Sequence, residues 1–448
     1  MTSTATANPP QIKCLDDLMR HLAACQQQAD QYTGRGVWIH RCTSAEIDAQ
    51  VNRLAGMLTE RRPLPLLGLT MAVKDNIDVA GLPTTAACPA FAYTPQVSAP
   101  VVQALCDAGA IVMGKTNLDQ FATGLVGTRS PHGACENFYN RAYISGGSSS
   151  GSAVAVAAGM ADFALGTDTA GSGRVPAGFN NLYGLKPSLG LLSTTGVVPA
   201  CRSLDCVSVF TRDLRTSARV MQIAEVFDEV DIYSRHRADI TTTRVLEKDG
   251  FRFGVPYADD LQFFGDSASQ SAFESAIARL QKAGGHSESI DYGPFHETAQ
   301  LLYEGPWVAE RLAAIQEFYE RNADQFLPVT RAIIGGAENL SAVDAFHGIY
   351  QLAALKKEAR KQWRHMDVLA VPTAGTIYTI EQVNADPVQL NKNLGYYTNF
   401  VNLLDLCALA VPAGFLPSGL PFGITLIAPA GNEATLFDIA ERFEKAGS

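Results

Sequence analysis

Residues 146–174 read GGSSSGSAVAVAAGMADFALGTDTAGSGR, within a longer stretch, 144–200, that is crowded with Gly, Ser and Thr. Two polar clusters, 146–152 and 166–174, flank the small apolar run 153–159. This run predicts a tightly packed, buried helix whose N-terminus faces the first serine cluster. The alternative is a flexible linker, but a linker would not enclose an apolar helix. We therefore expect the chemistry of the protein in this stretch.

The composition describes a globular chain with a large core. The chain has 448 residues, of which 47% are hydrophobic and 18% charged, and this balance argues against disorder. Lys and Arg number 35 against 45 Asp and Glu, for a net charge of −10. Binding to nucleic acid or to an anionic membrane calls for a clustered basic excess. Neither is therefore expected as a partner.

The cysteines and the first residues indicate a cytoplasmic protein. Nine cysteines are scattered along the chain without any C-x-x-C pair, as expected for reduced thiols and not for a zinc or redox site. Residues 1–11 lack the basic start and the apolar stretch of a secretory signal, so no export is implied. Residues 406–430 carry no charge and are long enough to cross a bilayer, but four prolines break them into short strands of a buried sheet.

Helical and strand patterns alternate along the chain, which predicts an α/β fold. Thr43 to Glu46 has the form of a capping box and predicts a helix over about 44–60. The other expected elements are a β-like run at 66–73, a helix around 101–105, a strand at 110–113, a helix around 273–280 that closes at Gly284-Gly285, and a strand at 367–371.

Two motif matches support other classes of function. Gly109 to Thr116 fits the phosphate-loop pattern G-x-x-x-x-G-K-[ST] with Lys115 as its lysine. Its variable positions, Ala-Ile-Val-Met, have the composition of a strand and not of an exposed cradle, which argues against phosphate binding. A nucleotide-binding protein that uses this segment is kept as the alternative from another class of function. Gly147 to Gly151 fits the nucleophile elbow G-x-S-x-G around Ser149, but no apolar strand precedes it and none of the eight histidines stands out as a catalytic base.

A hydrolase that needs no histidine uses a serine nucleophile, a second serine as relay and a lysine as base. The lysine can act only if its pKa falls from about 10.4 to about 7, which costs roughly 4–5 kcal/mol of desolvation. Lys74 follows the apolar, β-like run Leu69 to Val73, which would carry its side chain into the interior. The alternative is a lysine that reaches solvent from a strand end.

Five motifs carry a resemblance to a known family: Ala72–Asn76, Gly146–Ser152, Gly166–Arg174, Gly184–Pro187, and Asp367–Leu369 with Pro372-Thr373. Together they resemble the amidase signature family of Ser-Ser-Lys amide hydrolases over about residues 60–440. The resemblance implies an α/β amidase signature fold, with a large mixed β-sheet flanked by helices on both faces. We expect an N-terminal helical segment, 1–62, packed on a catalytic domain at 63–448.

The same resemblance implies roles for individual residues. Ser172 is the expected nucleophile, Ser148 the relay and Lys74 the base. The Gly147–Ser148 bond is expected to be cis, and Arg174 to support the nucleophile loop. The oxyanion hole is expected to consist of the backbone N–H groups of Thr169, Ala170, Gly171 and Ser172.

Within the family, the segments Asn117–Gly124, Thr169–Ala177 and Pro421–Thr425 look most like the allophanate hydrolase branch. By that resemblance Tyr303, Arg311 and Gly124 bind the substrate. Tyr303 and Arg311 are eight residues apart with Pro306 between them, and we expect them to project from one face of a helical segment. Spacing alone leaves an alternative, in which Arg311 pairs with Glu304 or Glu310 on a solvated helix.

The expected activity is hydrolysis of allophanate to N-carboxycarbamate and ammonia, in urea degradation and nitrogen metabolism. The substrate is a small amide with one carboxylate, no metal or organic cofactor is implied, and the family suggests a homodimer. Allophanate hydrolases of full length continue into a C-terminal domain, which is absent here if the chain ends at Ser448. The alternatives are another small-substrate amidase, the glutamine-directed subunit of an amidotransferase, and an inactive binding module.

Overall fold

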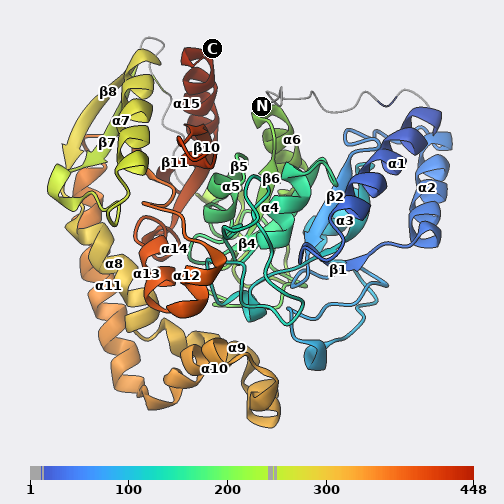
Figure 1. The fold of residues 1–448 in the computed structure, drawn as a ribbon, viewed down its shortest axis with the longest axis horizontal. Helices are drawn as coiled ribbons and strands as arrows, with labels where there is room; N and C mark the ends of the chain where they lie inside the picture. The colour runs from blue at the N-terminus through green and yellow to red at the C-terminus, as the bar shows by residue number, and fades with distance from the viewer. Residues whose placement is uncertain (1–11, 13–14, 241–245, 247–249, 448) are drawn as a thin grey trace.

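The computed structural model describes residue 12 and residues 15–240, 246 and 250–447. Across this part of the chain the strands form one sheet in the order β1-β3-β2-β4-β6-β5-β10-β11-β9-β7-β8 (Figure 1). The strands are β1 (Trp38–Arg41), β2 (Thr70–Lys74), β3 (Ile111–Thr116), β4 (Phe163–Asp168), β5 (Tyr183–Lys186), β6 (Cys206–Thr211), β7 (Phe251–Pro256), β8 (Gly285–Ile290), β9 (Val368–Pro372), β10 (Leu406–Phe415) and β11 (Pro421–Pro429).

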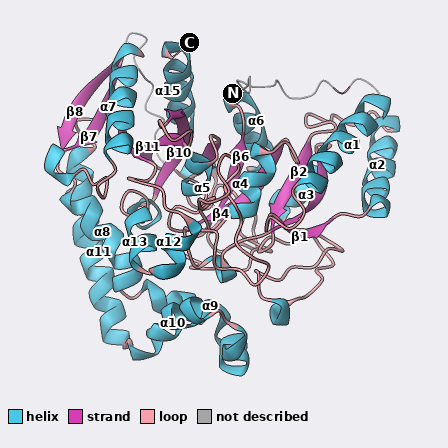
Figure 2. Cartoon of the chain, in the orientation of Figure 1, coloured by secondary structure: helices cyan, strands magenta, loops and turns pink. Residues whose placement is uncertain are grey.

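Helices cover both faces of this sheet and extend beyond it (Figure 2). They are α1 (Leu15–Gln31), α2 (Ser44–Thr59), α3 (Pro100–Asp107), α4 (Ser150–Ala157), α5 (Val175–Phe179), α6 (Leu214–Ala224), α7 (Ser267–Lys282), α8 (Gly293–Glu304), α9 (Trp307–Asn322), α10 (Pro328–Gly335), α11 (Ala342–Gln362), α12 (Ile380–Ala385), α13 (Gln389–Leu394), α14 (Phe400–Leu403) and α15 (Glu433–Ala446). The predicted α/β class with a large mixed sheet is confirmed.

The sheet mixes parallel and antiparallel pairs. β2 runs parallel to both β3 and β4, and β7 runs parallel to both β8 and β9. Antiparallel pairs of β4, β6, β5, β10, β11 and β9 join these two parallel blocks. The uncharged stretch 406–430 forms β10 and β11, which are buried over 406–411 and 421–428, as predicted for a sheet. The strands are longer than predicted, because β10 continues through Pro412 with a register shift between Pro412 and Gly414. Among the described helices, none is both long and apolar enough to cross a membrane.

Local signals explain several of these elements. The capping box at the start of α2 is present, because the Thr43 hydroxyl accepts the Glu46 N–H while the Glu46 carboxylate accepts the Thr43 N–H at 2.7 Å. The predicted buried helix is α4, and all of its residues except Ala157 are buried. A Cβ at Gly151 of this helix would lie 2.2 Å from the Val37 carbonyl oxygen, so the small residues of α4 permit its close packing against the chain around β1.

The phosphate-loop match is contradicted by the structure. Residues Ile111–Thr116 of the motif form β3 and are all buried, so their N–H groups cannot cradle a phosphate. Lys115 is fully buried, forms an ion pair with Asp75 at 3.1 Å and donates to the Thr84 hydroxyl at 2.9 Å. This lysine therefore ties β3 to the loop after β2, and the nucleotide-binding alternative at Gly109–Thr116 is wrong.

The helix α1 is attached to the sheet by a charged contact. His21 Nε2 lies 2.7 Å from Asp162 Oδ2, which also accepts the Thr70 N–H at 2.8 Å. Burial alone would lower the pKa of His21, but the hydrogen bond and the charge of Asp162 raise it to about 10. His21 is therefore protonated when paired with Asp162 at neutral pH.

The pair should make the stability of the protein depend on pH. Because the pKa of His21 is raised from 6.5 to about 10 on folding, its contribution is complete below pH 6.5 and is lost as the pH rises toward 10. We expect His21→Ala to lower the free energy of unfolding by about 1–3 kcal/mol at pH 6 and by much less near pH 10. Urea unfolding at several pH values measures this, with the exposed His347→Ala as control; a difference that does not change with pH would contradict it.

Candidate active site

Lys74 lies at the end of β2 and points toward α4. Along the strand, Met71 and Val73 pack in the hydrophobic cluster that includes α3 and α6, whereas Ala72 packs with α4. Since side chains alternate along a strand, Lys74 shares the face of Ala72. Its side chain is fully buried, which excludes the alternative of a lysine that reaches solvent.

The amine of Lys74 is held by two hydroxyl groups. Its Nζ lies 2.8 Å from Ser148 Oγ and 2.7 Å from Thr167 Oγ1, and it forms no ion pair with any residue that the structure describes. Burial lowers the pKa of Lys74 to about 7, although the charges of Asp119, Asp205 and Asp168 oppose this shift. At neutral pH a large fraction of the amine is therefore unprotonated and able to accept a proton.

Ser148 is presented to Lys74 by the turn before α4. The Gly147–Ser148 peptide bond is cis, and the Ser148 carbonyl accepts the Asp119 N–H at 3.1 Å. A Cβ at Gly147 would lie 2.1 Å from Asp119 Oδ2, so only glycine fits there. The neighbouring Ser149, the centre of the elbow match, donates to the Thr167 carbonyl at 3.1 Å instead of meeting a histidine.

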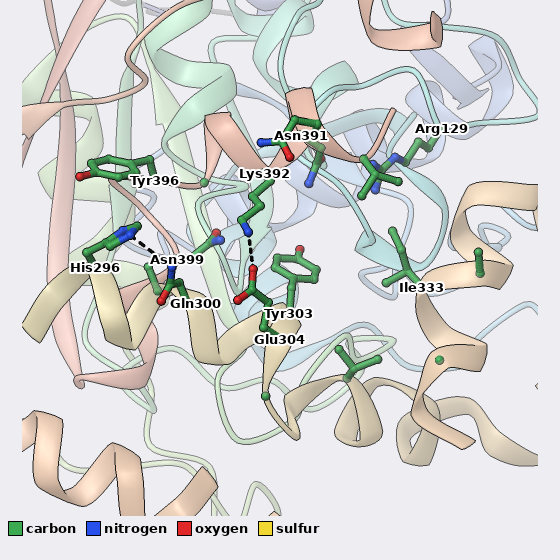
Figure 3. A pocket seen from close by; sticks show the side chains of 18 of the residues that line it. Arg129, His296, Gln300, Tyr303, Glu304, Ile333, Asn391, Lys392, Tyr396 and Asn399 are labelled. Carbon is green, nitrogen blue, oxygen red and sulfur yellow. Dashed lines mark hydrogen bonds and ion pairs between the residues drawn. The ribbon is translucent and has the colours of Figure 1, made fainter. Parts of the chain in front are cut away.

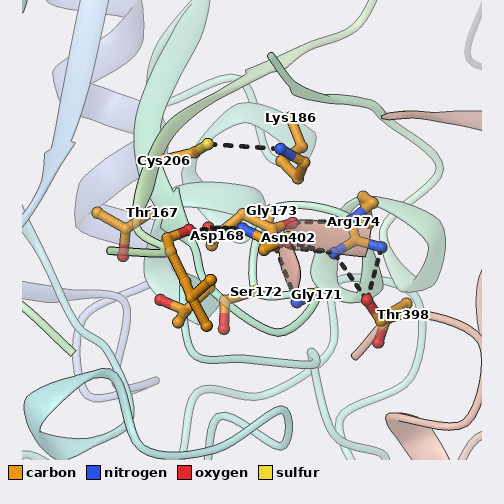
Figure 4. A network of polar contacts seen from close by, with 12 residues as sticks. Thr167, Asp168, Gly171, Ser172, Gly173, Arg174, Lys186, Cys206, Thr398 and Asn402 are labelled. Atoms are coloured by element: carbon orange, nitrogen blue, oxygen red, sulfur yellow. Dashed lines mark hydrogen bonds and ion pairs between the residues drawn. The ribbon is translucent and has the colours of Figure 1, made fainter. Parts of the chain in front are cut away.

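The loop that carries Ser172 lies between β4 and α5 and is held by a buried ion pair (Figure 4). Arg174 Nε and Nη2 each donate to the Asp168 carboxylate at 2.9 Å, and both side chains are fully buried. Burial alone would raise the pKa of Asp168, but Arg174 keeps it below its usual value. The same carboxylate accepts the N–H groups of Gly171 at 2.9 Å and Gly173 at 3.0 Å. The pair therefore shapes the backbone on both sides of Ser172.

Gly171 is expected to donate its N–H group in the oxyanion hole, but in the structure this N–H donates to the Asp168 carboxylate. By contrast, the N–H groups of Thr169, Ala170 and Ser172 have no acceptor within the described part of the chain. Gly171 has a φ of +133°, and a Cβ there would lie 2.4 Å from Thr398 Oγ1. Its role in the structure is to let the loop turn, so that the other three N–H groups can serve an oxyanion.

Gly124 lies beside Ser172, the expected nucleophile. The Ser172 hydroxyl donates to the Gly124 carbonyl at 3.5 Å, so the structure brings together residues 48 positions apart. Ser172 is buried, with 3% of its surface exposed. A substrate at Ser172 would therefore contact the Gly124 backbone.

Tyr303 and Arg311 are in contact, but they lie on two helices and not on one. Tyr303 lies at the end of α8 and Arg311 lies on α9, with a break at Gly305-Pro306 between the helices. The prediction of one shared helical segment is wrong, because Gly305 leaves the helical conformation, with φ −104° and ψ −168°. Nevertheless Arg311 Nη2 lies 3.3 Å from the Tyr303 hydroxyl, and its guanidinium lies 5.2 Å from the centre of the Tyr303 ring.

Arg311 has no carboxylate partner among the described residues. It is buried, with 2% of its surface exposed, and its Nε has no acceptor, while Nη1 lies 3.4 Å from Thr123 Oγ1, next to Gly124. Glu304 pairs with Lys392 and Glu310 bonds to Ser203, which excludes both pairings expected from the spacing alone. A buried guanidinium without a counter-ion can receive an anion.

A cavity of about 530 Å³ lies beside Tyr303, which is one of its lining residues (Figure 3). Tyr303, Arg129 and Asn391 line it, and the ion pair between Glu304 and Lys392 connects α8 to α13 beside it. Asn391 reaches the nucleophile region as well, since its Oδ1 accepts the N–H of Leu125 at 2.8 Å. The cavity thus adjoins the loop that carries Gly124.

Sequence reasoning assigned no role to Thr167, Asp119 or Asn391. Thr167 and Asp119 lie inside motifs quoted above, but nothing in their spacing indicates that one contacts Lys74 and the other Ser148. Asn391 meets Leu125 across 266 residues, a contact that only the folded chain creates. No group of three or more His, Cys, Asp or Glu side chains in the described ranges is arranged to hold a metal ion.

Comparisons with known proteins show which family the chain resembles. The family model described as Amidase matches residues 20–437. Urea amidolyase of Saccharomyces cerevisiae is 47% identical over 386 residues, which cover 86% of this chain and 21% of that protein. The chain thus spans about a fifth of the length of this curated relative.

Two further proteins of named activity are similar to this chain. The structure of allophanate hydrolase from Kluyveromyces lactis has a TM-score of 0.90 and 42% identity, covering 96% of this chain and 70% of that chain. One component of the glutamyl-tRNA(Gln) amidotransferase of Persephonella marina is 32% identical over 409 residues, covering 85% of this chain and 83% of that protein.

Proposed function

The chain belongs to the amidase family, and from this premise we propose that it hydrolyses allophanate to N-carboxycarbamate and ammonia through Ser172, Ser148 and Lys74. The observation that carries the proposal is the fully buried Lys74, whose Nζ lies 2.8 Å from Ser148 Oγ. Similarity to urea amidolyase and to allophanate hydrolase supports the choice of substrate.

In the proposed reaction Ser172 Oγ attacks the carbonyl carbon of the terminal carboxamide. Its proton passes to Ser148, whose own proton passes to the neutral amine of Lys74. The oxyanion accepts the N–H groups of Thr169, Ala170 and Ser172, each worth on the order of 3 kcal/mol in the transition state. Lys74 returns a proton to the leaving nitrogen and ammonia departs. Water then cleaves the acyl-enzyme and frees Ser172.

Arg311 and Tyr303 would bind the carboxylate of the substrate. The guanidinium of Arg311 is buried, has no carboxylate partner in the described structure and lies beside the Tyr303 hydroxyl, so an incoming carboxylate would gain charge-assisted hydrogen bonds away from water. Arg311 also contacts Thr123, the residue before Gly124, which supports a bound carboxylate near Gly124 and Ser172. An amide substrate without a carboxylate would leave this guanidinium unpaired.

We expect ammonia release from allophanate and malonamate to exceed release from biuret and glutamine. Arg311→Ala should lower kcat/KM for the two carboxylates about a hundredfold or more, because a buried charged partner is removed, and change the value for neutral biuret by less than about threefold. Ser172→Ala should abolish all activity. The exposed Arg141→Ala, which loses only a surface pair with Glu136, is the matched control.

The substrate panel also tests the rival activities. Preference for glutamine over both allophanate and malonamate would favour an amidotransferase-type glutaminase, in keeping with the relative from Persephonella marina. An equal loss on biuret and allophanate in Arg311→Ala would contradict the proposed carboxylate site.

The rate should fall at acid pH. Lys74 acts as a base only when unprotonated, and its pKa is lowered to about 7, so kcat/KM should drop about tenfold per pH unit below pH 7. Lys74→Ala should lose about 10²- to 10⁴-fold in activity. Steady-state kinetics between pH 5.5 and 9 measure this. A flat profile over that range would show that another group is the base.

We further propose that the chain is a cytoplasmic homodimer, as the resemblance implies. The described cysteines are free thiols, which suits a reducing compartment. On α11 the apolar residues Val343, Phe346 and Tyr350 are 62%, 56% and 65% exposed, and they recur at helical spacing on a face that a second copy would cover. Light scattering should give the mass of two chains, and Phe346→Glu should reduce it; a wild-type mass of one chain would contradict the dimer.

A further inference from the structure

Asp119 is a buried carboxylate beside the base and relay that the reaction above does not use. It lies on the loop after β3 and is fully buried. Backbone N–H groups of Val126, Gly127 and Arg129 donate to it at 3.1, 3.0 and 2.9 Å. It forms no ion pair with any residue in the described ranges. Backbone N–H groups, and no ion-pair partner within the described chain, therefore hold this carboxylate in place.

Two contacts connect Asp119 to the relay serine. Its backbone N–H donates to the Ser148 carbonyl at 3.1 Å. Its Oδ2 occupies the space next to Gly147, where a Cβ would lie only 2.1 Å away. The carboxylate thus packs against the peptide group that presents Ser148 Oγ to Lys74.

Three buried carboxylates act on Lys74 by their charge, but two of them have nearby cations. Asp168 is paired with Arg174, and Asp205 lies in the field of Arg311 while it accepts the N–H groups of Ala200 and Cys201. Of the three, Asp119 opposes the burial-induced fall in the pKa of Lys74 most strongly.

The other groups that face Asp119 do not cancel its charge by direct contact. The thiol of Cys135 is buried and uncharged, because burial raises its pKa to about 12. The guanidinium of Arg129 acts on Asp119 from a distance and donates to the Thr123 carbonyl at 2.8 Å. Within the described chain Lys74 has no ion-pair partner either, so the two buried groups complement each other.

We propose that Asp119 is a positioning residue that stabilises the protonated form of Lys74 while Ser172 attacks. The proposal rests on the proposed function. In that step the Ser172 proton moves to Ser148 Oγ as the Ser148 proton moves to Lys74 Nζ, so a neutral amine becomes an ammonium inside the protein. An uncompensated carboxylate nearby lowers the energy of that ammonium, and its fixed backbone donors keep it in place without reorganisation.

The charge can be removed with little change in shape by Asp119→Asn. The readout is the rate at which a phosphonofluoridate reagent labels Ser172 between pH 5 and 9, which reports activation of the serine whatever the natural substrate. We expect the acid limb of the labelling rate to move down by about one pH unit, because Lys74 becomes a weaker base. The plateau rate should fall about tenfold for the same reason. The matched control is Asp162→Asn, a buried carboxylate paired with His21, whose acid limb should stay in place.

The outcomes separate this proposal from the reaction on which it depends. If wild-type Ser172 is not labelled, or if Lys74→Ala is labelled as fast, the Ser-Ser-Lys reaction itself fails. If folded Asp119→Asn labels more slowly with an unchanged acid limb, or if Asp162→Asn shifts the limb equally, the role of Asp119 is overturned.

A second variant covers the case in which Asp119→Asn does not fold. Arg129→Gln removes the cation that opposes Asp119 from a distance and retains a donor for the Thr123 carbonyl. We expect its acid limb to move to higher pH, because the carboxylate then acts on Lys74 with less opposition. A limb that stays in place or moves to lower pH would overturn the proposal.

Discussion

An amine that is buried without a counter-ion is the constraint on which the rest of this structure depends. Among the described residues Lys74 contacts two hydroxyl groups and no carboxylate, so the interior has to tolerate a group that water would readily charge. Its place is set by β2, which is paired on both sides within the sheet. The position of Ser148 is set by the turn before α4. A displacement of either element would expose the amine or break its contact with Ser148.

A buried ion pair beside Ser172 holds the backbone of its loop. The pair of Asp168 and Arg174 is completely buried, and its carboxylate also binds two N–H groups of the nucleophile loop. Such a pair is costly to desolvate and adds little net stability. The ion pair instead sets the conformation of the loop. In this conformation the N–H groups of Thr169, Ala170 and Ser172 bond to no other described residue. This ion pair thus sets the geometry around Ser172, whereas Lys74 has no ion-pair partner within the described chain.

Sequence reasoning predicted what depends on local pattern. The capping box at Thr43, the apolar helix α4 and the β-structure of 406–430 follow from residue type and spacing, and the structure has all of them. Sequence reasoning failed where a single backbone angle, or a contact between residues far apart in the chain, determines the structure. The break at Gly305 places Tyr303 and Arg311 on two helices, yet packing still brings them together. Contacts of Asp119 with Ser148, and of Asn391 with Leu125, arise only from the folded chain.

The tight packing of α4 has an evolutionary consequence. A methyl group at Gly151 would meet the Val37 carbonyl at 2.2 Å, and one at Gly147 would meet Asp119, so the reacting centre has almost no tolerance for larger residues. The helices α8 and α13, which line the cavity, are partly exposed and bear long polar side chains. Selection for a different substrate would therefore change residues of these outer helices, while the residues around Gly147 and Gly151 stay the same. One scaffold can in this way acquire many specificities.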